Sequence, residues 1–272
     1  MRDILYGNAV LYFSRARREH PNNEDYHLHA HETYELLYFV EGRGRYLVEG
    51  HEYPSGKDCV MIMRPGEVHR LLVDETVPYE RICINFRPEL LESLDPDGLL
   101  LSLYDGRQLG ERNRYTVDCG EELLSLLPEP GEESRSGAPE LAARVFLLRC
   151  LYELCRQSGQ RSPAAADSIP LEPVLQYINN HLTEELSLSL IAARFYISPA
   201  QLNRLMKRSV GTTFWSYVQV KRLLIAKTLL RHGAPAGEAA ARCGFGEYSA
   251  FYRAYKKQFG VSPQADRQTP AV

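Results

Sequence analysis

The chain has 272 residues, of which 44% are hydrophobic and 25% charged, with a formal net charge of −3. This length and composition indicate a globular protein of two domains. The charged first 20 residues predict no signal peptide, and no apolar run approaches the length of a membrane span, which excludes a membrane partner. Six cysteines without CxxC spacing are typical of free thiols in a reducing cytoplasm.

Charge is distributed unevenly along the chain. Residues 171–272 contain 13 Lys and Arg against 6 Asp and Glu, whereas residues 1–170 contain 19 against 29. A basic C-terminal third on an acidic body indicates that this third binds a polyanion. Chance clustering of solvated charge is the alternative.

Short β-type segments fill the region from Tyr26 to Phe86. Apolar runs at 35–40, 45–49, 59–63, 71–73 and 81–86 are separated by turns that contain Gly or Pro. Closely spaced strands of this kind predict a small β-barrel or jelly roll.

Two histidine motifs lie on this frame. His29-Ala-His31 is followed by Glu35 and then Gly42, and Pro65-Gly66 is followed by His69. They resemble the two cupin motifs, HxHxxxE…G and PxGxxH, although the second lacks the spacer between Pro and Gly.

The cupin resemblance implies two alternatives for these side chains. In metal-binding cupins the matching residues would coordinate a divalent metal, and three imidazoles with one carboxylate suit Zn, Fe, Mn or Ni. In many sensor cupins they instead hydrogen-bond a ligand or one another. We expect no metal cofactor, and the four residues of the metal alternative are His29, His31, Glu35 and His69.

A small-molecule pocket at the barrel mouth is the expectation that follows, because barrels of this size usually hold one ligand. Polar groups with an aromatic wall suit a sugar or related metabolite. The candidate ligand contacts are His29, His31, Glu35, Tyr38, Arg45 and His69. Each of them could equally be a satisfied barrel side chain.

Residues 139–157 predict a long amphipathic helix. Its apolar residues recur at three- and four-residue steps, and such a stripe must be buried: Leu141, Val145, Leu148, Tyr152 and Cys155. The helix either covers the barrel or pairs with the same helix of a second chain, which would make a homodimer. Small polar residues at 159–170 predict the interdomain linker.

The C-terminal third contains a repeat. Ala192-Ala193-Arg194 recurs as Ala240-Ala241-Arg242 at an offset of 48, and the basic segment 204–208 recurs as 253–257 at an offset of 49. The repeat therefore predicts two helix-turn-helix units, the second turn one residue longer. Ser187, Ser198 and Glu247 are the expected helix caps. Residues 215–231 predict a long helix that joins the units.

The end of this pattern resembles the signature of the AraC/XylS family of regulators. The matching residues are Gly244, Phe245, Phe251, Arg253, Lys256, Gly260 and Pro263. Many of these regulators carry a cupin-like sensor at the N-terminus, so both halves match one arrangement. The resemblance implies an α+β chain: a cupin-like sensor at 1–158 with flanking helices, the linker at 159–170, and an all-α DNA-binding domain with two helix-turn-helix units at 171–267.

The same resemblance implies which residues contact double-stranded DNA. Arg can make two hydrogen bonds to guanine and Asn two to adenine, while Lys holds phosphates. Base-reading positions are Ala200, Asn203, Arg204, Tyr248, Ser249 and Tyr252; phosphate-facing positions are Arg253 and Lys256; Gln201 and Lys207 share the outward face. For Arg253 an intradomain salt bridge is the alternative.

Two functions are compatible with these motifs. The first is a cytoplasmic transcription regulator, not an enzyme, whose partners are DNA, a small-molecule effector, a second copy of the chain and RNA polymerase. The second is a metal-dependent cupin enzyme with an appended DNA-binding module, which requires a metal with an open coordination position.

Overall fold

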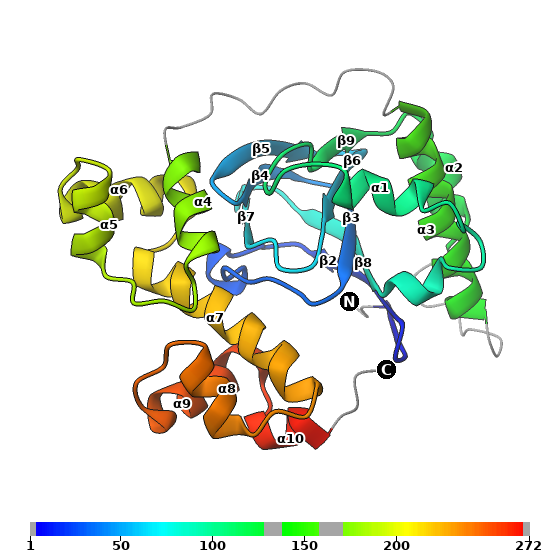
Figure 1. The fold of residues 1–272 in the computed structure, drawn as a ribbon. Helices are drawn as coiled ribbons and strands as arrows, with labels where there is room; N and C mark the ends of the chain where they lie inside the picture. Colours follow the sequence, from blue (N-terminus) through cyan, green and yellow to red (C-terminus); the bar gives the residue numbers. More distant parts are fainter. Residues whose placement is uncertain (1–3, 128–137, 158–170, 269–272) are drawn as a thin grey trace.

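The computed structural model describes residues 4–127, 138–157 and 171–268. Figure 1 shows a β-rich unit, blue to green, beside an all-helical unit, yellow-green to red. The expected α+β class is confirmed. The expected linker at 159–170 lies outside the described residues.

The β-rich unit consists of two antiparallel sheets. Their strand orders are β1-β2-β8-β3-β6-β9 and β5-β4-β7. The strands are β1 (Ile4–Gly7), β2 (Leu11–Arg18), β3 (Tyr34–Glu41), β4 (Arg43–Val48), β5 (His51–Gly56), β6 (Cys59–Met63), β7 (His69–Val73), β8 (Tyr79–Phe86) and β9 (Arg114–Thr116).

Alternation along the strands divides the β-rich unit into two cores. In β3, Leu37 and Phe39 point into the space between the sheets, where they pack with Tyr46. Leu36 and Tyr38 point to the other face, which the helices cover. Successive residues of a strand face opposite sides, so this parity decides which side chains can reach a ligand.

The helices of the β-rich unit cover the larger sheet. They are α1 (Leu99–Asp105), α2 (Gly120–Ser125) and α3 (Ala138–Gln157), with short 3₁₀ turns at Asn23–Asp25 and Pro88–Leu90. The buried face of α3 is not the predicted stripe. It is formed by Ala143, Phe146, Leu147, Cys150, Leu151 and Leu154.

The helical unit confirms the duplication. Its helices are α4 (Glu172–Asn180), α5 (Leu188–Arg194), α6 (Pro199–Ser209), α7 (Phe214–Arg231), α8 (Ala236–Arg242), α9 (Tyr248–Phe259) and α10 (Pro263–Gln268). The turn between α5 and α6 spans residues 195–198 and the turn between α8 and α9 spans 243–247, so the second is one residue longer as predicted.

Two of the three expected helix caps are present. The Ser187 hydroxyl accepts a hydrogen bond from Leu190 N at 3.1 Å. Ser198 and Gln201 form a reciprocal capping box at the start of α6. Glu247 precedes α9 with extended backbone, but its side chain makes no capping hydrogen bond, so that expectation was wrong.

The two units share a hydrophobic core. Ala30 and Val68 of the β-rich unit are buried in the same cluster as Leu175 of α4 and Phe214 and Tyr217 of α7. Both histidine motifs therefore lie on segments that pack directly against the helical unit.

Candidate functional site

The predicted histidines converge on one another. Backbone hydrogen bonds in both directions join His29 to His69, at 3.1 and 2.9 Å. Ring centroids lie 4.4 Å apart for His29 and His69, 4.9 Å for His29 and His31, and 5.3 Å for His31 and His69. Glu35 Oε2 lies 3.2 Å from His31 Nε2 and 3.1 Å from His69 Nε2. The structure thus brings together four of the six predicted ligand contacts.

Neighbouring charges set the protonation states of this cluster. Burial opposes ionisation of Glu35, but the facing imidazoles of His31 and His69 outweigh it and hold the Glu35 pKa well below its usual range. Burial also opposes protonation of His69, yet Glu35 raises the His69 pKa. Burial, with His69 and His31 nearby, lowers the pKa of His29 to about 3, so His29 is neutral at pH 7.

The same cluster is the place where a divalent metal would bind. His29 Nδ1 contacts His27 O at 2.7 Å and His69 Nδ1 contacts Glu67 O at 2.9 Å, which leaves both Nε2 atoms for a ligand. The ligand atoms of the three histidines lie within 4.8 Å of one another. Imidazole nitrogens bind zinc at about 2.1 Å, and the three histidines are grouped closely enough to be candidate ligands for one ion.

Two predicted ligand contacts point elsewhere. The Tyr38 hydroxyl bonds Asp58 and its ring packs against Phe146 of α3, outside the space between the sheets. Arg45 is an exposed side chain that pairs with Glu52 at 3.1 Å. Neither lies with the histidines, because Tyr38 is three residues from the inward-facing Glu35 and Arg45 directly precedes the inward-facing Tyr46.

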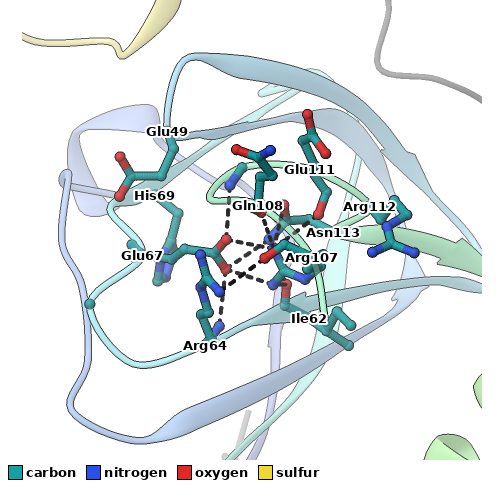
Figure 2. A network of polar contacts seen from close by, with 12 residues as sticks. Glu49, Ile62, Arg64, Glu67, His69, Arg107, Gln108, Glu111, Arg112 and Asn113 are labelled. Atoms are coloured by element: carbon teal, nitrogen blue, oxygen red, sulfur yellow. Dashed lines mark hydrogen bonds and ion pairs between the residues drawn. The ribbon is translucent and has the colours of Figure 1, made fainter. Parts of the chain in front are cut away.

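The buried carboxylate of Glu67 holds the segment of the second histidine motif in place, and the sequence motifs predicted no role for Glu67. Figure 2 shows Glu67, with no exposed surface, receiving two hydrogen bonds from Arg107 at 2.6 and 2.7 Å. Asn113 Nδ2 and the Gly110 N–H donate to the same carboxylate at 3.0 and 2.9 Å. Burial of Glu67 is outweighed by Arg107, so the Glu67 pKa is lowered. The position of Glu67 inside the motif, between Gly66 and His69, was the only feature of the sequence that could have indicated this role.

A cavity of about 640 Å³ lies between the β-rich unit and α7 and α9. His29, Tyr46 and Arg81 line it from the β-rich unit. Sequence reasoning missed Tyr46 and Arg81. In β8 apolar residues occur on both faces of the strand, because both faces of the sheet are covered. The sequence therefore could not show that Arg81 points into the space between the sheets.

A buried ion pair also joins the two units. Glu49, in the turn after β4, accepts hydrogen bonds from Lys221 Nζ, from the Tyr217 hydroxyl at 2.6 Å and from Val68 N at 2.7 Å. Lys221 also donates to Gly66 O at 2.8 Å. Lys221 and Glu49 are only 6% and 4% exposed, so the contact is desolvated.

The outward faces of α6 and α9 form a candidate DNA-binding surface. Arg204 and Lys207 on α6 and Arg253 and Lys256 on α9 are exposed. Over the described residues Arg253 makes no salt bridge, contrary to the alternative considered for it. Ala200, Ser249, Tyr248 and Tyr252 are exposed as well.

Two residues of that predicted surface are engaged within the helical unit. Asn203 is half-buried and its Oδ1 accepts a hydrogen bond from Phe214 N at 3.1 Å, at the start of α7. Paired recognition of adenine needs that oxygen, so the expected role of Asn203 is not supported. Gln201 Oε1 accepts from Ser198 N at 2.9 Å in the capping box, and only its amide nitrogen remains for DNA.

Comparison with known proteins finds matches over both units. Residues 13–149 match the AraC-like ligand binding domain, and residues 191–269 match a helix-turn-helix domain. The HTH-type transcriptional activator RhaS of Citrobacter koseri is 27% identical over 248 residues, which cover 88% of this chain and 87% of that protein. RhaS of Salmonella schwarzengrund matches to the same extent, with 27% identity.

Solved structures are similar over the whole chain or over its end. Fatty acid-bound ToxT from Vibrio cholerae is 13% identical and covers 100% of this chain and 98% of its own, with a TM-score of 0.43. The C-terminal domain of AraT, a response regulator from Geobacillus stearothermophilus, is 31% identical over 39% of this chain and 91% of its own, with a TM-score of 0.37.

Proposed function

Because the chain belongs to the AraC family of transcriptional regulators, we propose that it binds a specific DNA site through α6 and α9 and that an effector in the β-rich unit alters this binding. The chain is a regulator with a ligand-binding domain and not an enzyme. The hypothesis of a metal-dependent cupin enzyme is therefore withdrawn.

The observation that carries the DNA-binding proposal is the exposure of basic side chains on two duplicated helices, α6 and α9. Figure 1 shows that α7 runs between the group of helices that contains α6 and the group that contains α9. An 18-residue helix such as α7 is about 27 Å long. That length supports a spacing of about one DNA turn between the two recognition helices, with each one entering a major groove.

The test begins with DNA selected from random oligonucleotides by the wild-type protein. Arg204→Ala should weaken binding by roughly 1–3 kcal/mol and relax preference at one base pair. Lys256→Ala should reduce the salt dependence by about one unit and keep the base preference. Arg242→Ala, an exposed arginine on α8 paired with Glu238, is the matched control. Unchanged affinity of Arg204→Ala for both selected and scrambled DNA would contradict the assignment.

We propose that the effector is a sugar or related metabolite bound near His29, His31, Glu35 and His69 without a metal. The support is the ion pair of Glu35 and His69, in which two residues of the cluster satisfy each other without an ion. Elemental analysis of the purified protein tests this: a stoichiometric divalent metal would contradict it.

Three further proposals concern partners and location. The exposed apolar stripe of α3 supports a homodimer formed through residues 139–157. Relatives named as activators support RNA polymerase as a partner. Free thiols support a cytoplasmic location; no helix in the described ranges is long and apolar enough to cross a bilayer.

A further inference from the structure

Arg81 is a half-buried cation that forms no ion pair; the Glu35 carboxylate acts on it electrostatically but lies beyond ion-pair distance. Its side chain points from β8 into the space that also holds Tyr46 and Tyr79, and it lines the cavity between the units. Its guanidinium makes no hydrogen bond or ion pair with any residue that the structure describes. A guanidinium stays protonated at any ordinary pH, and withdrawing it partly from water without a paired anion is unfavourable.

A second donor near Arg81 is also unsatisfied. The Tyr79 hydroxyl is buried and has no hydrogen-bond partner, and Arg81 lies close enough to act on it electrostatically. Buried polar groups are normally paired, so two unpaired donors in one place indicate a missing acceptor. An anionic group in the cavity would pair with Arg81, which lines it.

The rest of the cavity wall carries groups that suit hydroxylated molecules. Thr212, Ser216 and Gln219 line it from the helical unit and can donate or accept hydrogen bonds. Lys257 of α9 adds a second positive charge, while Asp25 is an exposed acid at the rim. A volume of about 640 Å³ is within the range of small-molecule sites.

We propose that this cavity binds a small acidic sugar derivative, a sugar acid or a sugar phosphate, whose carboxylate or phosphate pairs with Arg81. The proposal rests on the proposed function, because it specifies the class of the effector. The ligand would contact β8 on one side and α7 and α9 on the other. Its binding would therefore strengthen the contact between the two units and fix the position of the second recognition helix.

Thermal unfolding of the full chain tests the site. D-glucuronate, D-glucose 6-phosphate, inorganic phosphate and neutral D-glucose are compared at equal millimolar concentration and constant ionic strength. At least one anion should raise the wild-type Tm by about 3 °C or more, and glucose should not. The glucuronate and phosphate arms distinguish a carboxylate site from a phosphate site.

The variants are Arg81→Met and, as a control, Arg45→Met, which changes an exposed arginine on β4. Arg81→Met should lose the response to anions and, without ligand, should melt no lower than wild type because an unpaired charge has gone. Arg45→Met should keep the response. Arg81→Gln is the second variant if Arg81→Met does not fold.

Three results would overturn the proposal: no anion raises the wild-type Tm, an anion raises the Tm of Arg81→Met equally, or neither Arg81 variant folds, which would make Arg81 structural. DNA selection on the same preparation keeps the two proposals apart. If the protein selects a specific DNA site but no anion raises its Tm, only the proposed anion site is refuted. If an anion raises the Tm but no DNA site is selected, the proposed DNA binding is refuted.

Discussion

At the scale of single residues, the repeat places two different side chains at one strained backbone position. Tyr196 and Gly244 follow the first helix of each helix-turn-helix unit, and their φ values are 56° and 73°. A side chain in this left-handed region costs about 1–2 kcal/mol, which glycine avoids. Tyr196 is 97% exposed and so has no packing to compensate for the strain.

Substitutions at these two positions should have opposite effects. Tyr196→Gly should raise the free energy of unfolding by up to about 1 kcal/mol, because the lost strain exceeds the added chain entropy. Gly244→Ala should lower it by roughly 2 kcal/mol or more, since the new Cβ would lie 2.8 Å from Arg222 Cζ. Arg222 cannot easily yield, because its guanidinium donates to Leu182 O, Glu184 O and Gly244 O. Urea unfolding of both variants measures these changes. Equal changes in the free energy of unfolding of the two variants would refute the proposed difference in backbone strain.

The neutral His29 makes stability depend on pH. Its folded pKa of about 3 lies below the usual 6.5, so the unfolded chain takes up the proton first as the pH falls. The stabilisation that the neutral His29 contributes to the folded chain is complete above pH 6.5 and is lost progressively toward pH 3. Between pH 7 and pH 5 the loss should be about 2 kcal/mol. In His29→Gln this part of the loss should disappear, which denaturant unfolding at the two pH values would detect; an unaltered pH dependence would argue against it.

Residue-level prediction from sequence succeeded where a motif fixed the spacing and failed where strand parity decided. The positions of His29, His31, Glu35 and His69 follow from the two motifs, and the structure brings them together. Tyr38 could have been excluded, because its odd separation from Glu35 puts it on the other face of β3. Arg81 and Asn203 could not have been assigned, since each depends on which neighbour a half-buried side chain meets in the folded chain.

At the scale of elements, α3 has two apolar faces. The face against the sheet is buried, while Leu141, Val145 and Tyr152 on the predicted stripe are 64%, 40% and 56% exposed. Periodicity could show that the helix is amphipathic, but with apolar residues on two faces it could not say which one meets the sheet. An exposed apolar stripe on a long helix is typical of a protein interface.

A charge on this stripe should break the proposed dimer. Val145→Glu should raise the dimer dissociation constant at least tenfold, about 1.4 kcal/mol, because a carboxylate would be desolvated at the interface. Sedimentation equilibrium measures this. Leu94→Glu, at a leucine outside α3 that is 61% exposed, should leave the dissociation constant unchanged. A wild-type protein that is monomeric at high concentration would refute the proposed interface.

At the scale of the whole molecule, the two units are joined by a buried ion pair and a shared core. Glu49 and Lys221 are far apart in sequence and carry no motif, so sequence could predict two domains but not how they pack. A desolvated pair of this kind depends on both partners, because either one alone would be a buried unpaired charge.

Lys221→Met should therefore lower the free energy of unfolding of the full chain by about 3 kcal/mol. The double variant Glu49→Gln/Lys221→Met should recover part of that loss, since no charge is left unpaired. Chemical denaturation of the full chain measures both. Lys207→Met, which removes an exposed lysine on α6, is the control, and a loss below about 1 kcal/mol in Lys221→Met would mean that the pair does not couple the units.

The burial of Ala30 and Val68 among residues of α4 and α7 has a consequence for engineering. A chimera that exchanges whole sensors between relatives would replace one side of this packed surface and leave the other unchanged. Such hybrids should fold poorly unless the facing positions on α4 and α7 are exchanged together with the sensor. The modular unit for building new biosensors from this chain is therefore the sensor plus the surface on which it rests.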